Sequence, residues 1–203
     1  MSIESLGAFT EITLGFEALG RPRNAAATRQ AILDAATQRF ARESYDDVGV
    51  RDIAGDVGVD PALISRYFGS KEDLFDEVMN VCMAGSDLMD GPREDFGRRV
   101  AHEIVYGPKK KEAKMTGLLI MLRSIGSAKA SEVIRRSSHR CFYGPFAQWL
   151  GEPDGAVRAR LAGGLMMGVS IGRDISGGFD LSKDECEILC RRLAAALQDL
   201  VDR

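Results

Sequence analysis

One short segment of the chain, residues 51–74, carries polar side chains that suit contact with nucleic acid. It reads RDIAGDVGVDPALISRYFGSKEDL. Arg66 can present two N–H donors to a guanine, which is worth on the order of 1–3 kcal/mol of discrimination. Arg51 and Tyr67 can donate hydrogen bonds to phosphates. Lys71 lies in the expected first turn of a helix, where backbone N–H groups also favour a phosphate.

Residues for catalysis or metal binding are sparse by comparison. The sequence has no phosphate-binding loop, nucleophile elbow or metal-ligand pair, and its two histidines are isolated. Its four cysteines fit no metal-binding spacing. Cys186 and Cys190 stand one helical turn apart, so a redox switch or metal site is an alternative, but buried reduced thiols are the favoured interpretation. We therefore expect no enzyme activity, no metal and no cofactor.

The polar residues of this segment need two short helices to position them. Apolar spacing predicts one helix over 51–57 and another from Asp60 to about Phe68. Gly58 can take the positive φ of a tight turn between them. Pro61 fits the first position of the second helix, where no backbone N–H is needed. The pattern predicts a helix-turn-helix whose later helix faces outward. The alternative is an ordinary αα-hairpin inside a helical bundle.

Helical spacing continues through most of the chain. A helix over 28–43 offers an apolar face against which the two short helices can pack. The stretch from Ser70 to Asp73 is typical of a capping box that starts another helix, and Ser182 with Glu185 forms a second such box. Further helical patterns cover 94–106, 112–126, 130–150, 155–176 and 183–202. No alternating strand pattern appears, so the sequence predicts an all-α fold.

The order of these motifs resembles the N-terminal domain of TetR-type (tetracycline-repressor-like) transcriptional regulators. The matching stretch is AILDAATQRFARESYDDVGVRDIAGDVGVDPALISRYFGSKEDLF. The resemblance implies an N-terminal three-helix DNA-binding domain and a C-terminal helical bundle for ligand binding and dimerisation. Weak periodicity predicts a mobile arm at 1–23, and the resemblance implies the helix-turn-helix domain at 24–70 and the ligand-binding and dimerisation domain at 71–203. Carried over by position, the implied DNA contacts are Arg51, Asp60, Pro61, Ala62, Leu63, Ser65, Arg66, Tyr67 and Lys71.

Two departures from the family pattern leave a second function open. The family usually has tyrosine where this chain has Ser65, and threonine or serine where it has Gly49. The first removes a phosphate contact or an aromatic ring, and the second removes a side-chain cap from the following helix. Acidic residues nearly balance basic ones between 21 and 71. The alternative is a helical small-molecule- or protein-binding module that has lost specific operator recognition.

The C-terminal helical patterns fit a dimer interface. Glycines at four-residue steps in 155–176 let another helix approach closely, and the 183–202 pattern carries a leucine stripe. In the resembled family, two such helices per subunit form a four-helix interface. The alternative is that both helices pack only within one chain. The predicted interface residues are Leu161, Gly164, Leu165, Gly168, Leu189, Leu193 and Leu200.

The middle of the chain is rich in methionine and aromatic residues. A cavity with such a lining accepts a bulky apolar or aromatic ligand with a few polar anchors. The same side chains would serve equally well as ordinary core, which is the alternative for each of them. The predicted ligand-binding residues are Met83, His102, Met121, Phe142, Phe146, Trp149, Met167 and Ser170.

Length and composition agree with a soluble regulator. The chain has 203 residues, of which 45% are hydrophobic, and a formal net charge of −3. No basic residue precedes Arg21, which is the wrong charge order for a secretory signal. The longest apolar run ends at Arg173 and is too short to span a bilayer. We therefore expect a cytoplasmic homodimer that represses at a pseudo-palindromic DNA operator, is released by a small-molecule effector, and makes no membrane contact.

Overall fold

The computed structural model describes residues 21–83, 87–107 and 112–202. Within these ranges the chain is helical with no strand, which confirms the predicted all-α fold, and no helix is both long and apolar enough to cross a membrane. Two 3-10 turns, Asp87–Met89 and Arg93–Asp95, precede α5, and a π-helical turn, His139–Tyr143, joins α7 to α8. The α-helices are α1 (Arg21–Arg42), α2 (Val50–Val57), α3 (Ala62–Phe68), α4 (Lys71–Met83), α5 (Phe96–Tyr106), α6 (Glu112–Ser124), α7 (Ala128–Ser138), α8 (Gly144–Leu150), α9 (Gly155–Ile175) and α10 (Lys183–Asp202).

The helices begin and end close to the predicted positions, with three differences. α1 begins at Arg21, earlier than the predicted residue 28, and so includes the last three residues of the predicted arm. Residues 1–20 of that arm lie outside the described ranges. The helix predicted over 130–150 is interrupted by the π-helical turn, and a 3-10 turn replaces the first residues of the helix predicted over 94–106.

Both predicted capping boxes form. Ser70 Oγ accepts a hydrogen bond from Asp73 N at 3.0 Å, while Asp73 Oδ2 accepts one from Ser70 N at 3.1 Å. Ser182 Oγ accepts from Glu185 N at 3.3 Å, and Glu185 Oε2 accepts from Ser182 N at 2.8 Å. These bonds pair N–H groups that the first turn of a helix leaves without partners. They explain why α4 and α10 begin where the sequence predicts.

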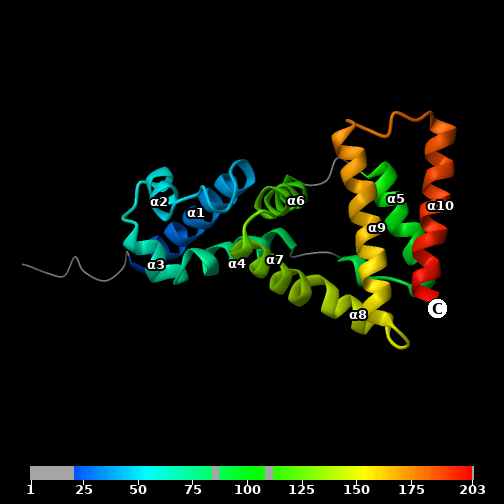
Figure 1. Cartoon of the computed structure of the whole chain (residues 1–203), viewed down its shortest axis with the longest axis horizontal. Helices are drawn as coiled ribbons and strands as arrows, with labels where there is room; N and C mark the ends of the chain where they lie inside the picture. The colour runs from blue at the N-terminus through cyan, green and yellow to red at the C-terminus, as the bar shows by residue number, and fades with distance from the viewer. Residues whose placement is uncertain (1–20, 84–86, 108–111, 203) are drawn as a thin grey trace, which may run out of the picture.

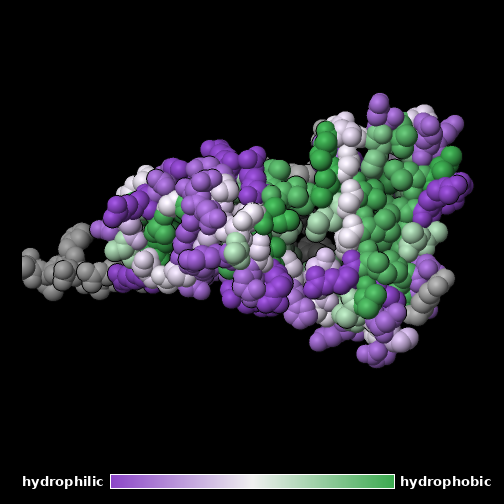
Figure 2. Space-filling model, in the orientation of Figure 1, coloured by the Kyte–Doolittle hydropathy of each residue, from purple (hydrophilic) through white to green (hydrophobic). Residues whose placement is uncertain are grey.

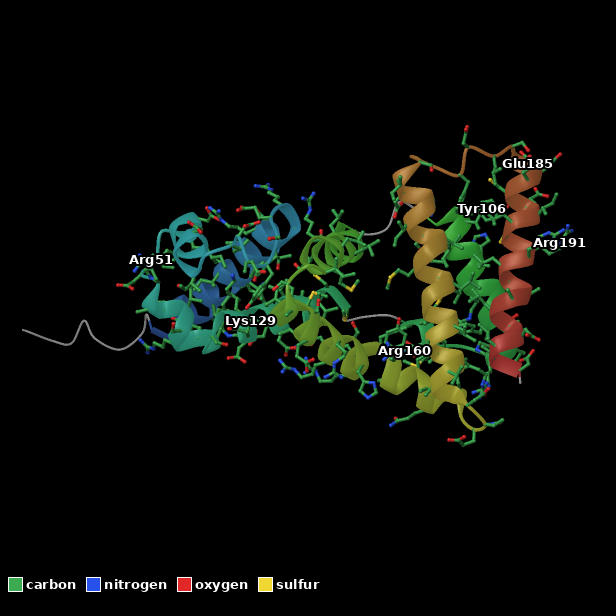
Figure 3. The ribbon with its side chains drawn as sticks, in the orientation of Figure 1. Arg51, Tyr106, Lys129, Arg160, Glu185 and Arg191 are labelled. Atoms are coloured by element: carbon green, nitrogen blue, oxygen red, sulfur yellow. The ribbon has the colours of Figure 1, made fainter. Side chains whose placement is uncertain are left out.

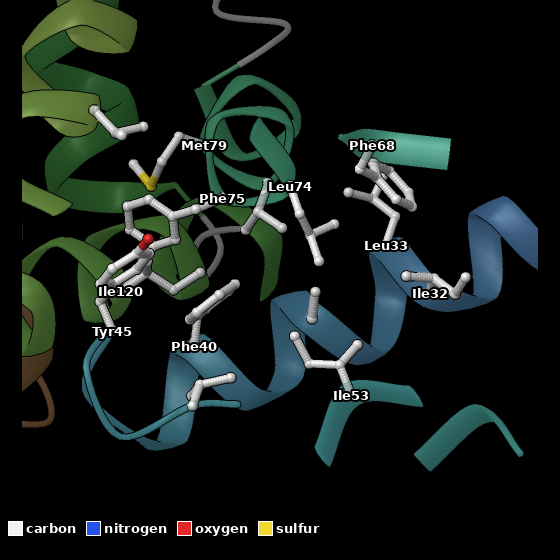
Figure 4. Close-up of a cluster of buried hydrophobic side chains, with 14 of the residues drawn as sticks. Ile32, Leu33, Phe40, Tyr45, Ile53, Phe68, Leu74, Phe75, Met79 and Ile120 are labelled. Carbon is white, nitrogen blue, oxygen red and sulfur yellow. The ribbon is translucent and has the colours of Figure 1, made fainter. Parts of the chain in front are cut away.

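The first of two hydrophobic cores, here called the N-terminal core, joins the helix-turn-helix to the middle of the chain (Figure 4). Phe40 of α1, Tyr45 and Phe75 of α4 form an aromatic cluster with ring centroids 4.9 to 5.8 Å apart. Ile53 of α2 and Ile120 of α6 are fully buried in the same core. Burying an aliphatic or aromatic side chain contributes about 1.5–3 kcal/mol. The core therefore holds the short helices that cannot be stable alone.

The second core, here called the C-terminal core, is formed by α5, α8, α9 and α10. Phe96, Phe146 and Trp149 make a second aromatic cluster, with ring centroids 5.3 to 5.8 Å apart. Leu193 of α10 is buried in the same core. α10 lies very close to α5 at Gly97, where a Cβ atom would be 2.2 Å from a backbone carbonyl of α10.

The two cores lie toward opposite ends of an elongated chain (Figure 1). α1, α2 and α3 lie at one end, α5, α9 and α10 at the other, and α4, α6 and α7 between them. The predicted boundary between residues 70 and 71 does not separate the cores, because α4, α6 and α7 contribute Phe75, Ile120 and Val133 to the N-terminal core. The division into domains at that boundary stays a prediction.

Candidate nucleic-acid interface and ligand cavity

The turn between α2 and α3 has the left-handed conformation that its glycine permits. Gly58 takes φ 72° and ψ 36°, which costs glycine little. Its N–H donates to Gly55 O at 3.2 Å, and Val59 N donates to Ala54 O at 3.0 Å. These bonds pair carbonyls at the end of α2 that would otherwise lack partners. They fix the direction in which the chain leaves α2, and hence the position of α3.

The start of α2 shows how the chain manages without a side-chain cap at Gly49. No side chain of residue 49 can cap the helix, as the sequence predicts. Instead Asp52 Oδ2 accepts a hydrogen bond from Gly49 N at 3.0 Å. A Cβ atom at residue 49 would lie 2.6 Å from that oxygen. The glycine therefore gives room to a carboxylate that helps to hold the start of α2.

α3 presents a polar face to solvent. Ile64 and Phe68 are buried in the N-terminal core, so the opposite face of α3 points outward. Asp60 Oδ1 accepts a hydrogen bond from Ala62 N at 2.8 Å and caps the helix. Pro61 precedes the helix in a helical conformation. Of the residues predicted to contact DNA, Asp60, Ala62, Ser65 and Arg66 are exposed, and Pro61, Leu63 and Tyr67 are half-buried.

Arg51 and Arg66 are cations that the protein does not use for its own structure. Both side chains are exposed, Arg51 near the start of α2 and Arg66 on α3. Neither forms an ion pair or a hydrogen bond with any residue that the structure describes. Figure 3 shows Arg51 at the outer edge of the helix-turn-helix end. Their charge is available to a polyanion.

Other arginines of this end are committed to internal contacts. Arg39 of α1 binds Asp56 of α2 with two hydrogen bonds, Nε to Oδ2 at 2.5 Å and Nη2 to Oδ1 at 2.8 Å. These bonds hold the pKa of Asp56 below its ordinary value. Arg29 pairs with Glu77 of α4 and lies 4.5 Å from the centroid of the Phe68 ring. These two arginines therefore tie α1 to α2, α3 and α4.

Lys71 is also engaged by its own chain. Its Nζ donates to Tyr45 O at 2.5 Å and lies 4.2 Å from the centroid of the Tyr45 ring. Burial lowers the pKa of Lys71 from 10.5, although nearby carboxylates, Asp46 first among them, oppose this. A lysine ammonium has three donors, so the bond to Tyr45 leaves others for a phosphate.

A cavity of about 260 Å³ lies between α4, α6, the end of α7 with its π-helical turn, and α9. Its surface is mainly methionine, leucine and aromatic side chains. Five predicted ligand-binding residues lie on it: Met83, Met121, Phe142, Met167 and Ser170. The rest of the described lining is Cys82, Leu88, Leu118, Ser138, Tyr143, Gly163, Met166 and Asp174.

Three predicted ligand-binding residues lie elsewhere. Phe146 is fully buried in the C-terminal core, and Trp149 packs against it beneath the guanidinium of Arg93. His102 is exposed on α5, with its ring centroid 5.2 Å from that of Tyr106. The reason is that an aromatic-rich sequence does not distinguish the wall of a cavity from the filled core beside it.

The α9 side of the cavity has a sequence pattern that the prediction uses only in part. Steps of three and four residues place Gly163, Met166, Ser170 and Asp174 on one helical face. A Cβ atom at Gly163 would lie 2.8 Å from Cε1 of Tyr143 and 3.1 Å from Cε1 of Phe142. The glycine therefore makes room for both rings at the π-helical turn.

A different face of α9 is apolar and uncovered. Val157, Leu161 and Ile175 are 57%, 56% and 79% exposed, and Gly164 and Gly168 lie exposed between them. Figure 2 shows hydrophobic surface over the end that contains α5, α9 and α10, whereas the helix-turn-helix end is mainly hydrophilic. The stripe includes three of the residues predicted for a dimer interface.

The four remaining residues of that predicted interface face inward. Leu193 is only 4% exposed, because it lies in the C-terminal core of its own chain. The other three are partly buried against the same core. The leucine stripe of α10 therefore packs mainly within its own chain, against α5. These inward-facing residues are Leu165, Leu189, Leu193 and Leu200.

Comparison with protein families agrees with this arrangement of a helix-turn-helix joined to a helical bundle. A model of bacterial regulatory proteins of the tetR family matches residues 32–78. A model of the tetracyclin repressor-like C-terminal domain matches residues 94–201. The chain belongs to the TetR family of transcriptional regulators, whose members are DNA-binding proteins and typically repressors. No curated protein sequence matches it significantly.

Solved structures share the fold over most of the chain. A TetR-family regulator from Streptomyces coelicolor A3 is 23% identical, with a TM-score of 0.55, 91% of this chain covered and 99% of that one. NalD, the secondary repressor of the MexAB-OprM multidrug efflux pump in Pseudomonas aeruginosa, is 20% identical, with a TM-score of 0.61 and coverages of 84% and 95%. A protein from Saccharomonospora viridis described as a transcriptional regulator, in complex with choline, is 18% identical, with a TM-score of 0.54 and coverages of 85% and 96%.

Proposed function

We propose that this protein is a homodimeric repressor that binds a pseudo-palindromic DNA operator and leaves it when a small apolar or aromatic ligand enters the cavity. The observation that carries the proposal is the outward face of α3, with Ser65 and Arg66 exposed beside the free cation Arg51. A helix of this kind fits the major groove, where side chains reach base edges. Arg66 would read a guanine, and Arg51 would bind a phosphate.

The exposed stripe of α9 supports the dimer. It is apolar, and its glycines permit close approach of a helix from a second copy. A two-fold axis through this stripe would place one helix-turn-helix at each end of the pair. Two recognition helices must meet half-sites roughly 34 Å apart, so a dimer with fixed spacing gives the specificity that one copy lacks.

α4 supports a coupling between the cavity and DNA. Its first turn carries Lys71 next to α3, and its last turn carries Cys82 and Met83 on the cavity wall. A ligand that fits only one position of this end of α4 would shift the population toward that arrangement. The spacing of the two recognition helices would change with it, because α4 shares the N-terminal core with α3.

Binding to the DNA upstream of the protein's own gene, measured at several salt concentrations, tests the proposal. Wild-type protein should bind it more tightly than unrelated DNA of equal length. Arg66→Ala should weaken specific binding about 5- to 150-fold, which corresponds to roughly 1–3 kcal/mol. Arg191→Ala, which removes an exposed arginine of α10 (Figure 3), is the matched control and should change nothing. Equal affinity for both DNAs would contradict sequence-specific repression.

A second candidate is a ligand- or protein-binding module without operator recognition. The engagement of Lys71 by Tyr45, together with Ser65 in place of the family's tyrosine, favours it. The two candidates differ in one variant. If the double change Arg66→Ala, Lys71→Ala leaves DNA affinity intact, the module is the better description.

A further inference from the structure

We infer that the cavity selects a lipophilic cation, with Asp174 as its counter-ion and the Met- and aromatic-lined wall as the site of its apolar body. This inference rests on the proposed function, because it takes the cavity to be the effector site. It goes further in assigning the charge of the ligand and the residue that recognises it.

Asp174 is the charged side chain of the described lining, whose other members are apolar, aromatic, hydroxyl or thiol groups. No ion pair or hydrogen bond joins its carboxylate to any described residue. The adjacent cation is not free to neutralise it, because Arg173 donates to Ile104 O at 2.7 Å and to Gly107 O at 2.6 Å. A partly buried carboxylate beside an apolar wall is stabilised when a cation comes to it.

The position of Asp174 in its helix adds to the preference. It lies in the last turn of α9, which ends at Ile175. The C-terminal end of a helix carries the negative end of the helix dipole, which favours cations and disfavours anions. The carboxylate and the helix end therefore both attract a cation. Both would repel an anionic ligand.

The rest of the lining can accept the apolar part of such a ligand. The rings of Phe142 and Tyr143 lie edge to face, with centroids 5.0 Å apart. Arg160 already lies 4.0 Å from the centroid of the Tyr143 ring, so Phe142 is the ring left for the aromatic ring of the ligand. Met83, Met121 and Met167 add polarisable sulfur and adaptable shape. The volume of about 260 Å³ suits one aromatic ring with a small ammonium head.

Three small probes that share a benzyl group separate charge from hydrophobic fit. They are benzyltrimethylammonium, its uncharged carbon isostere neopentylbenzene, and phenylacetate as the anion. Each is titrated into the full-length wild-type protein, Asp174→Asn and Asp184→Asn. The last variant removes the same charge from an exposed carboxylate of α10 outside the cavity.

We expect Asp174→Asn to raise the Kd of benzyltrimethylammonium by about tenfold or more. The Kd of neopentylbenzene should stay within about threefold of the wild-type value. Phenylacetate should bind to Asp174→Asn but not to the wild type. Asp184→Asn should match the wild type. An ammonium affinity unchanged in Asp174→Asn, an absence of ammonium binding, or an anion bound as tightly as the cation would each overturn the inference. Those outcomes leave the proposed function standing, since only the operator measurement decides that.

Discussion

The two ends of the chain are built on similar cores but leave opposite surfaces. Each core contains three aromatic rings in contact, Phe40, Tyr45 and Phe75 at one end and Phe96, Phe146 and Trp149 at the other. No large hydrophobic side chain between residues 25 and 68 is exposed, whereas α9 exposes an apolar stripe. Contiguous apolar surface of this kind is common where proteins bind a partner. The comparison teaches that one end buries its apolar side chains within a single chain and is polar outside, while the other leaves apolar surface uncovered, as the proposed dimer requires.

The means of joining helices also differ between the ends. At the helix-turn-helix end, arginines pair with carboxylates, as Arg39 does with Asp56. At the other end, Arg93 and Arg158 donate to backbone carbonyls at the ends of α8 and α10, and Arg158 also pairs with Asp154 at the start of its own helix. Cations suit helix C-termini because of unpaired carbonyls and the helix dipole. The helices of this end therefore depend on two arginines that donate hydrogen bonds to carbonyls at their C-termini.

The largest expected effect comes from matched truncations in the two cores, Phe75→Ala and Phe146→Ala. Each side chain is fully buried, so each change should cost about 3–5 kcal/mol of the free energy of unfolding. Phe75→Ala should weaken DNA binding more than self-association, and Phe146→Ala the reverse. Urea unfolding, sedimentation equilibrium and a DNA-binding assay measure the three quantities. If both variants lose both activities equally, the ends do not act as separate regions.

A change at Arg158 tests the dependence on carbonyl contacts. This side chain is 4% exposed and donates to Gly151 O at 2.6 Å and Leu200 O at 3.1 Å. Arg158→Lys keeps the charge but loses the planar fork, so several carbonyls lose their donor. We expect a loss of about 2–3 kcal/mol, measured by thermal or urea unfolding. Arg191→Lys, on the exposed side of α10, should leave the free energy of unfolding unchanged. If Arg158→Lys also leaves it unchanged, Arg158 does not have this structural role.

Asp76→Asn tests the polar contacts that connect α4 to α7 and to the π-helical turn beside the cavity. Asp76 accepts hydrogen bonds from Ser137 and, at 2.8 Å, from Arg140 of the π-helical turn. Burial opposes its ionisation, but these bonds prevail and hold its pKa below the ordinary 3.8. A carboxylate with a lowered pKa stabilises the fold above its unfolded pKa, and that stability is lost as pH falls through the folded pKa.

The variant should therefore be about 2 kcal/mol less stable than the wild type at pH 7. The difference should shrink as pH falls below 3.8. Urea unfolding at a series of pH values gives both quantities. Asp90→Asn, an exposed carboxylate, is the control. A difference that does not depend on pH would mean that Asp76 acts by packing and not by charge.

The smallest effect is expected at two neighbouring glycines of α9. Gly164 faces open space, so Gly164→Ala should stabilise the helix by roughly 0.5–1 kcal/mol in a dilute protomer. It should also weaken self-association by preventing close helix approach. Gly163→Ala should instead destabilise the fold, because its Cβ would meet Tyr143 at 2.8 Å. Thermal melting and sedimentation at several concentrations distinguish these outcomes, and unchanged association of Gly164→Ala would argue against the stripe as the interface.

The helices themselves could be predicted because their causes are local. The predicted ranges for α9 and α10 agree with the structure to within one residue. Capping side chains, glycine turns and apolar spacing all act over a few residues, so one sequence suffices to find them. The outward position of Arg66 follows from the same spacing, since Ile64 and Phe68 must face the core.

The sites were only partly predictable because they depend on which apolar face meets which neighbour. Phe142 and Phe146 stand four residues apart with the same chemistry, yet the first lines the cavity and the second fills the core. Likewise Leu161 faces solvent and Leu165 faces the C-terminal core. Nothing within a single helix distinguishes these pairs.

The amino-acid order by itself determined the helices, the tight turn at Gly58 and the polar side of α3, since each depends on neighbours within one or two turns. Tertiary structure alone decided that Lys71 binds Tyr45, that the leucines of α10 face α5, and that Asp174 stands at the edge of an apolar cavity. Those outcomes depend on contacts between segments far apart in the chain, and so on how whole helices pack.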